Sequence, residues 1–149
     1  GCGTMGFGIP AAMGACYGAP DRTVCMFCGD GGFQMTIQEL GTIMENQIPV
    51  KMILLNNNYL GNVRQWQYMF SNKRYSFTPM LNPDYEKIAA GYNIPCRTVV
   101  EREELDAAIR EMLETDGPYL LQCAVKEEDN VLPMTPPGAN VDEMLLEVN

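Results

Sequence analysis

The sequence has 149 residues, of which 46% are hydrophobic and 19% are charged, as in an ordinary globular protein of one domain. Its 19 acidic and 10 basic residues give a net charge of −9, which argues against nucleic acid or an anionic membrane as a partner. The chain contains no histidine, so Ser-His-Asp and Cys-His mechanisms and histidine-based zinc sites are excluded.

Periodicity and turn residues predict alternating helices and strands followed by an irregular tail. In chain order, the predicted helices cover residues 6–18, 33–46, 61–70, 84–91 and 101–113. The predicted strands cover residues 23–28, 50–55, 96–100 and 119–125. Prolines and a glycine interrupt the tail, residues 126–149. This alternation predicts a three-layer α/β fold with a mostly parallel sheet of about four to six strands.

The six cysteines do not form an obvious metal or redox site. Cys25 and Cys28 spell C-x-x-C, but they fall within a predicted strand, where this odd spacing points their side chains to opposite faces. We expect buried free thiols in a reducing cytoplasm. No signal peptide or run of eighteen apolar residues is present. The chain starts within a motif and without Met, which suggests a piece of a longer chain.

Two polar motifs follow the first two predicted strands. Gly29-Asp30-Gly31-Gly32 follows the first strand, and Asn56-Asn57-Asn58 follows the second. The carboxyl ends of parallel strands meet at one sheet edge, so we expect Asp30 and Asn57 to be neighbours. A carboxylate and an amide oxygen suit Mg²⁺, which fills its other positions with phosphate and water. The motifs therefore predict a site for a metal-bound phosphate or diphosphate.

Simpler interpretations of these motifs remain open at this point. An Asp-Gly-Gly turn before a helix is often only an N-cap, and asparagines are common in loops. The pattern Gly1-x-Gly3-x-x-Gly6 resembles a dinucleotide fingerprint but has no strand before it. The large side chains of residues 58–78 suit either a helix packed on the core or a substrate-facing lid. The cations of this segment suit either an anionic substrate or solvent; they are Arg64, Lys73 and Arg74.

Four segments together resemble the large, catalytic subunit of acetolactate synthases, also called acetohydroxyacid synthases. They are residues 1–12, 54–61, 64–67 and 131–134, and the resemblance extends over nearly all of the chain. It corresponds to the C-terminal domain of that subunit, which has the thiamine diphosphate-binding fold. The resemblance implies an enzyme that condenses two pyruvates, or pyruvate and 2-oxobutanoate, with loss of CO₂. The products are the acetohydroxy acids of branched-chain (isoleucine and valine) amino-acid biosynthesis.

The resemblance also implies roles for individual residues. Mg²⁺ would be held by the side chains of Asp30 and Asn57 and by the backbone carbonyl of Tyr59. Thiamine diphosphate would contact Gly3, Met5, Gly29, Gly31, Gly32, Phe33 and Asn57. Met5 would hold the cofactor bent, and the Gly3 carbonyl would accept a hydrogen bond from the cofactor's amino group.

Other implied roles concern the substrate and the parts of the enzyme outside this sequence. Trp66 would face the substrate and favour 2-oxobutanoate as the acceptor, whereas Asn62 departs from the methionine common in the family. No catalytic residue is assigned here, because the activating glutamate lies in the N-terminal domain of a neighbouring subunit. We therefore expect a homodimer or homotetramer with its active site at the subunit interface, and an inactive isolated domain. The resemblance leaves open a regulatory small subunit and an FAD elsewhere in the full-length protein, but not on this domain.

Two other classes of function compete with this interpretation. Other thiamine diphosphate enzymes share the metal motif, and they include pyruvate oxidase, sulfoacetaldehyde acetyltransferase and glyoxylate carboligase. A non-catalytic nucleotide- or phosphate-binding module would also use glycine-rich turns at a sheet edge.

Overall fold

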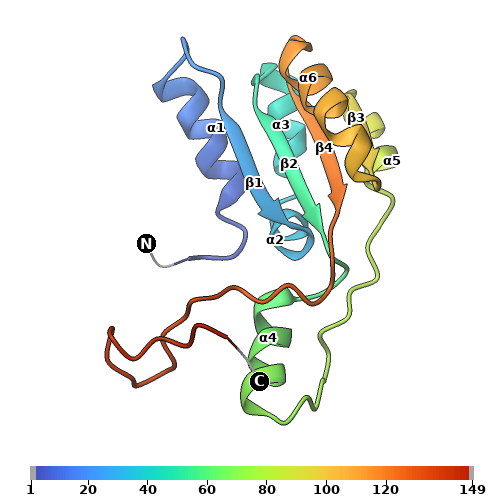
Figure 1. Cartoon of the computed structure of the whole chain (residues 1–149). Helices are drawn as coiled ribbons and strands as arrows, with labels where there is room; N and C mark the ends of the chain where they lie inside the picture. Colours follow the sequence, from blue (N-terminus) through green and yellow to red (C-terminus); the bar gives the residue numbers. More distant parts are fainter. Residues whose placement is uncertain (1–2, 148–149) are drawn as a thin grey trace.

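The computed structural model describes residues 3–147, which fold around a four-stranded parallel sheet (Figure 1). The strands are β1 (Cys25–Gly29), β2 (Lys51–Asn56), β3 (Cys96–Val99) and β4 (Tyr119–Ala124). Their order in the sheet is β1-β2-β4-β3, and every neighbouring pair is parallel. The predicted α/β architecture is confirmed, and each strand lies within two residues of its predicted bounds.

Most helices also lie where the periodicity placed them. They are α1 (Gly8–Gly18), α2 (Asp30–Met35), α3 (Glu39–Asn46), α4 (Gly61–Phe70), α5 (Tyr85–Gly91), the 3-10 turn η1 (Arg102–Glu104) and α6 (Leu105–Glu114). The single helix predicted over 33–46 is wrong, because it is two helices. The first begins at Asp30 and ends at Met35; the hydroxyl of the next residue, Thr36, donates to the Gly6 carbonyl at 2.9 Å. None of the described helices has the length and apolarity needed to cross a bilayer.

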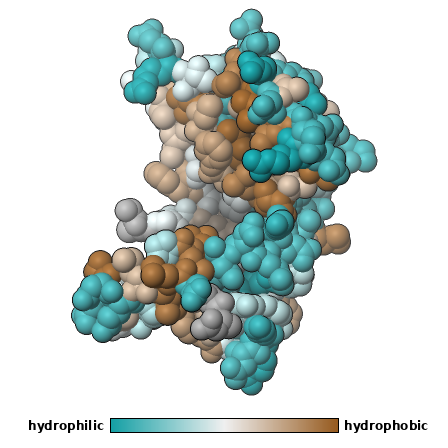
Figure 2. Space-filling view, viewed as in Figure 1, coloured by the Kyte–Doolittle hydropathy of each residue, from teal (hydrophilic) through white to brown (hydrophobic). Residues whose placement is uncertain are grey.

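The two faces of the sheet are covered unequally. Side chains from α1, α2, α3 and α5 bury one face, which includes the fully enclosed Met52, Leu54 and Leu120. Helix α6 packs on the other face through Ala108 and Met112. Figure 2 shows hydrophobic atoms gathered over the strands on this second face. Both faces of a parallel sheet are normally covered. In the described residues, by contrast, this second face remains partly open.

The strand β1 illustrates the difference between the faces. Cys25 is exposed on the open face, whereas Cys28 packs against the covered core. The prediction that the two thiols point to opposite faces is therefore confirmed. Helix α4 and the tail lie beyond the carboxyl ends of the strands (Figure 1).

Candidate cofactor and metal site

A cavity of about 710 Å³ opens at the carboxyl ends of β1, β2 and β4. Its wall combines the loop before α1, the first turn of α2, the β2–α4 loop and the start of the tail. Eight residues predicted from the sequence line it: Gly3, Met5, Gly29, Asp30, Gly31, Gly32, Asn57 and Tyr59. The topology thus brings together segments from both ends of the chain.

Asp30 is the most informative residue of this wall. Its side chain is 2% exposed, and among residues 3–147 no lysine or arginine forms an ion pair with it. Oδ2 accepts hydrogen bonds from the Asn58 backbone N–H at 2.9 Å and from the Asn82 amide at 2.6 Å. Within residues 3–147, Oδ1 accepts only from the Gly31 N–H at 3.0 Å. A buried carboxylate without a cation is costly, so this position fits a bound metal ion.

The loop after β2 places two more oxygens beside this carboxylate. The pairing of Gly29 with Leu55 sets the two strand ends side by side, as the sequence predicted. The Asn57 amide lines the cavity, and its Oδ1 accepts from the Tyr59 N–H at 3.1 Å. The Tyr59 carbonyl accepts no hydrogen bond from a backbone N–H in the described loops and turns. One carboxylate, one amide and one carbonyl form an oxygen donor set of the kind that Mg²⁺ takes.

Glycines bring the backbone close to neighbouring side chains around this cavity. Gly6 has a φ of +88°, and a Cβ there would lie 3.0 Å from Met35 Cβ. A Cβ on Gly31 would lie 2.6 Å from the Met5 methyl group and 3.1 Å from Leu60. The positive φ and these close approaches explain why glycine occupies these positions. Gly1, the first glycine of the fingerprint pattern, lies outside the described residues.

Two predicted contacts are not among the cavity-lining residues. Phe33 is fully buried in the core, and its ring packs edge-on against Tyr85 with centroids 5.6 Å apart. The helix was expected to start at Phe33 but starts at Asp30, and the contact of Phe33 with the cofactor stays a prediction. Trp66 is 40% exposed on α4, where it packs against Phe70 and does not line the cavity.

Helix α4 and the tail are tied together beside the cavity. The Arg64 guanidinium lies between the rings of Tyr59 and Tyr75, at 4.8 and 4.6 Å from their centroids, and pairs with Glu128. Gln65 exchanges two hydrogen bonds with the backbone of Val131. Arg64 is therefore engaged within the protein and not simply solvated. These contacts hold the start of the tail against the site, where Lys126 and Asp129 line the cavity.

Burial changes the titration of two groups near Asp30. Desolvation, followed by the Asp30 charge, raises the pKa of the Cys28 thiol to about 12. Desolvation also raises the pKa of the Tyr85 hydroxyl to about 12. Both the thiol and the hydroxyl therefore stay protonated at neutral pH.

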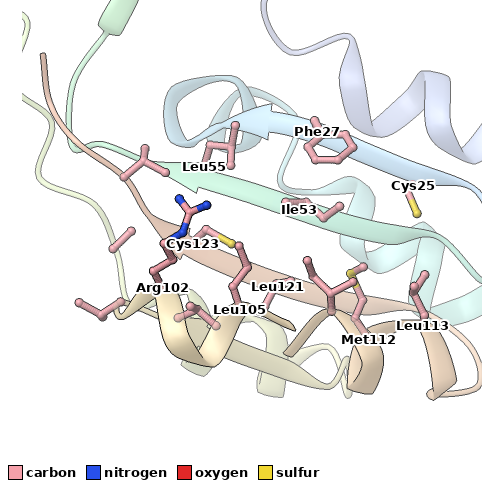
Figure 3. Close-up of a pocket in the computed structure, with 15 residues that line it drawn as sticks. Cys25, Phe27, Ile53, Leu55, Arg102, Leu105, Met112, Leu113, Leu121 and Cys123 are labelled. Carbon is pink, nitrogen blue, oxygen red and sulfur yellow. The ribbon is translucent and has the colours of Figure 1, made fainter. Parts of the chain in front are cut away.

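A second cavity, of about 630 Å³, lies on the open face of the sheet. Figure 3 shows Phe27, Ile53 and Leu55 of the strands facing Leu105 and Met112 of α6 across it. Its charged lining is limited to Arg102 among the described residues. The two cavities share Phe27, Leu55 and Val125, but only the first contains polar groups suited to a cation.

Comparison with known proteins identifies a family whose ligand suits a polar cavity. Residues 1–123 match the family model described as "Thiamine pyrophosphate enzyme, C-terminal TPP binding domain". The chain belongs to this family. Thiamine pyrophosphate is thiamine diphosphate, so the thiamine diphosphate-binding fold inferred from the motifs is confirmed. Among the described residues of this domain, no group of three or more Cys, Asp or Glu side chains could hold a metal alone.

The similar proteins are much longer than this thiamine diphosphate-binding domain. It is 47% identical over 97% of its length to the acetolactate synthase isozyme 2 large subunit of Escherichia coli (strain K12), covering 27% of that protein. It is 44% identical over 99% of its length to acetolactate synthase 1, chloroplastic, of Oryza sativa subsp. japonica, covering 24% of it. The domain thus spans about a quarter of each relative.

A solved structure supports the fold independently. The domain resembles the thiamine diphosphate-dependent 4-hydroxybenzoylformate decarboxylase of Rhodococcus jostii RHA1, with a TM-score of 0.76 and 30% identity. The similarity covers 82% of this chain and 23% of that one.

Proposed function

We propose that this chain is the thiamine diphosphate- and Mg²⁺-binding domain of an acetolactate synthase large subunit. The observation that carries the proposal is Asp30, a 2%-exposed carboxylate without an ion-pair partner among the described residues, at a cavity of about 710 Å³. Similarity to two acetolactate synthase large chains, at 47% and 44% identity, supports this choice over other enzymes of the superfamily.

Each residue of the wall has a defined task in this proposal. Asp30, Asn57 and the Tyr59 carbonyl would hold Mg²⁺, whose positive charge would suit the diphosphate. Gly29, Gly31 and Gly32 let the backbone approach the bound anion, while Gly3 and Met5 position the rings. When bound, thiamine diphosphate supplies the electron sink for decarboxylation of a 2-oxo acid. The domain itself binds and orients, and it shields the reacting centre from water.

The full-length protein would condense two pyruvates, or pyruvate and 2-oxobutanoate, in isoleucine and valine biosynthesis. It would work as a homo-oligomer, because the resemblance implies that the activating glutamate comes from a neighbouring subunit. We also propose that it works in the cytoplasm. The described cysteines are free thiols, which favours a reducing compartment. This domain alone would bind but not catalyse. A regulatory small subunit stays an open expectation, and an FAD, if the full-length protein has one, would not lie on this domain.

The decisive experiment compares two isosteric substitutions in the full-length protein. Asp30→Asn removes the buried charge, and Asp21→Asn removes an exposed one as the matched control. Ligand at a hundred times its Kd stabilises a folded protein by about 2.7 kcal/mol. We expect the wild type and Asp21→Asn to gain this stability only with Mg²⁺ and thiamine diphosphate together, and Asp30→Asn to gain none. Equal stabilisation of all three proteins would overturn the metal assignment.

The same preparation separates the competing functions. Incubation with pyruvate, with and without 2-oxobutanoate, should yield 2-acetolactate and 2-acetohydroxybutyrate. Acetyl phosphate as the main product would instead identify a pyruvate oxidase if it forms from pyruvate, or a sulfoacetaldehyde acetyltransferase if it forms from sulfoacetaldehyde. Tartronate semialdehyde formed from glyoxylate would identify a glyoxylate carboligase. Stabilisation by ATP or NAD, but not by thiamine diphosphate, would identify a nucleotide-binding module.

A further inference from the structure

The backbone brings Asn82, a residue far away in sequence, to the proposed metal site. Residues 78–80 run antiparallel to residues 58–60. In this pairing the Leu60 N–H donates to the Thr78 carbonyl and the Met80 N–H donates to the Asn58 carbonyl, both at 2.8 Å. The segment then continues to Asn82, which precedes α5 and ends beside Asp30.

The Asn82 side chain touches both loops that supply the proposed ligands. Its Nδ2 donates to Asp30 Oδ2 at 2.6 Å, to Asn56 Oδ1 at 2.9 Å and to Asn58 Oδ1 at 3.0 Å. Asp30 follows β1, Asn56 is the last residue of β2, and Asn58 follows that strand. One amide group therefore connects the ends of both strands.

Two donors fix the orientation of this amide. The Asn82 Oδ1 accepts hydrogen bonds from the Gln34 amide at 2.7 Å and from the Tyr85 hydroxyl at 3.1 Å. A rotated amide would place its oxygen against the Asp30 carboxylate and its NH₂ group against the Gln34 NH₂ group. The arrangement with Nδ2 toward Asp30 avoids both contacts, and its two N–H groups are shared among three acceptors.

We propose that Asn82 is a positioning residue that holds the Asp30 carboxylate and the Asn56–Asn58 loop in the geometry needed for Mg²⁺. Together with the Asn58 N–H, it saturates Oδ2, so Oδ1 keeps the capacity to bind a cation. Groups that orient metal ligands from behind typically change metal affinity 10–100-fold when removed. This inference rests on the proposed function.

The test measures thiamine diphosphate binding to the full-length protein by calorimetry over a series of Mg²⁺ concentrations. Asn82→Ala removes all three donated hydrogen bonds. Asn46→Ala is the control, because Asn46 is an exposed asparagine whose side chain, among the described residues, bonds within its own helix. We expect Asn82→Ala to need about tenfold or more Mg²⁺ for half-saturation and to regain full stoichiometry at high Mg²⁺. The control should match the wild type.

A second variant keeps the test valid if Asn82→Ala does not fold. Gln34→Leu leaves Asn82 in place but removes a group that orients it, so we expect a smaller shift in the same direction. An unchanged Mg²⁺ requirement in the folded variants, even with lower thermal stability, would show a merely structural role and overturn the inference. A wild type that does not bind thiamine diphosphate with Mg²⁺ would instead overturn the proposed function on which it rests.

Discussion

Both faces of the sheet carry apolar side chains, but the two faces are covered to very different extents. On the covered face, side chains from four helices enclose Phe33, Met52 and Leu120 completely. On the open face, α6 leaves Phe27 67% exposed beside an apolar cavity of about 630 Å³. The polar cavity at the strand ends is only slightly larger, at about 710 Å³. The comparison teaches that volume and apolar lining do not distinguish the proposed site here, whereas one buried carboxylate without an ion-pair partner among the described residues does.

The largest expected effect comes from truncating one phenylalanine on each face. Phe33→Ala empties a fully buried site and should lower the free energy of unfolding by about 3–5 kcal/mol. Phe27→Ala removes a ring that is mostly in solvent and should cost less than about 1 kcal/mol. Urea unfolding of both variants measures the difference. Similar losses would mean that the faces are equally packed and that the contrast is wrong.

A smaller effect tests whether the tight packing of the covered face extends to the polar cavity. Gly31→Ala would place a methyl group against Met5, Leu60 and Met80 and should cost about 1–3 kcal/mol. The matched control is Gly14→Ala in α1, where no other atom lies within 4 Å and helix propensity should add about 1 kcal/mol. Thermal unfolding should therefore shift in opposite directions, and a stabilised Gly31→Ala variant would contradict the packing described here.

The smallest expected effect is chemical and compares two thiols of one strand. Cys28 has its pKa raised to about 12, so its thiol remains protonated at pH 8, and its alkylation should accelerate as the pH rises toward 12. Cys25 is exposed on the open face. Peptide mapping after iodoacetamide treatment at pH 8 should find Cys25 modified about tenfold or more faster. In urea the two rates should converge; equal rates in the folded chain would remove the distinction between the faces.

The sequence predicted much of the fold because each strand is a short apolar run between clear turns. It could not predict the break between α2 and α3, because Phe33, Ile37 and Leu40 keep helical spacing across it. The break coincides with a hydrogen bond from Thr36 to Gly6, a contact between distant segments. The start of α2 at Asp30, before the predicted start at Phe33, was also missed.

The candidate site was predictable where its residues follow directly from topology. Asp30 and Asn57 directly follow neighbouring parallel strands, so their proximity follows from the strand order alone. Asn82 was missed, since in the sequence it resembles only the start of a helix. Its position depends on the pairing of residues 78–80 with 58–60, and no local pattern encodes that pairing.

The wall of the polar cavity runs from Gly3, near the start of the chain, to Asp129, close to its end. During synthesis the binding site therefore cannot form until nearly the whole domain has left the ribosome and folded. A ligand that contacts this complete wall would bind only to chains in which the segments from Gly3 to Asp129 have folded together. Its binding energy then stabilises all layers of the fold together, so the supply of cofactor would change how much of the newly made protein stays folded.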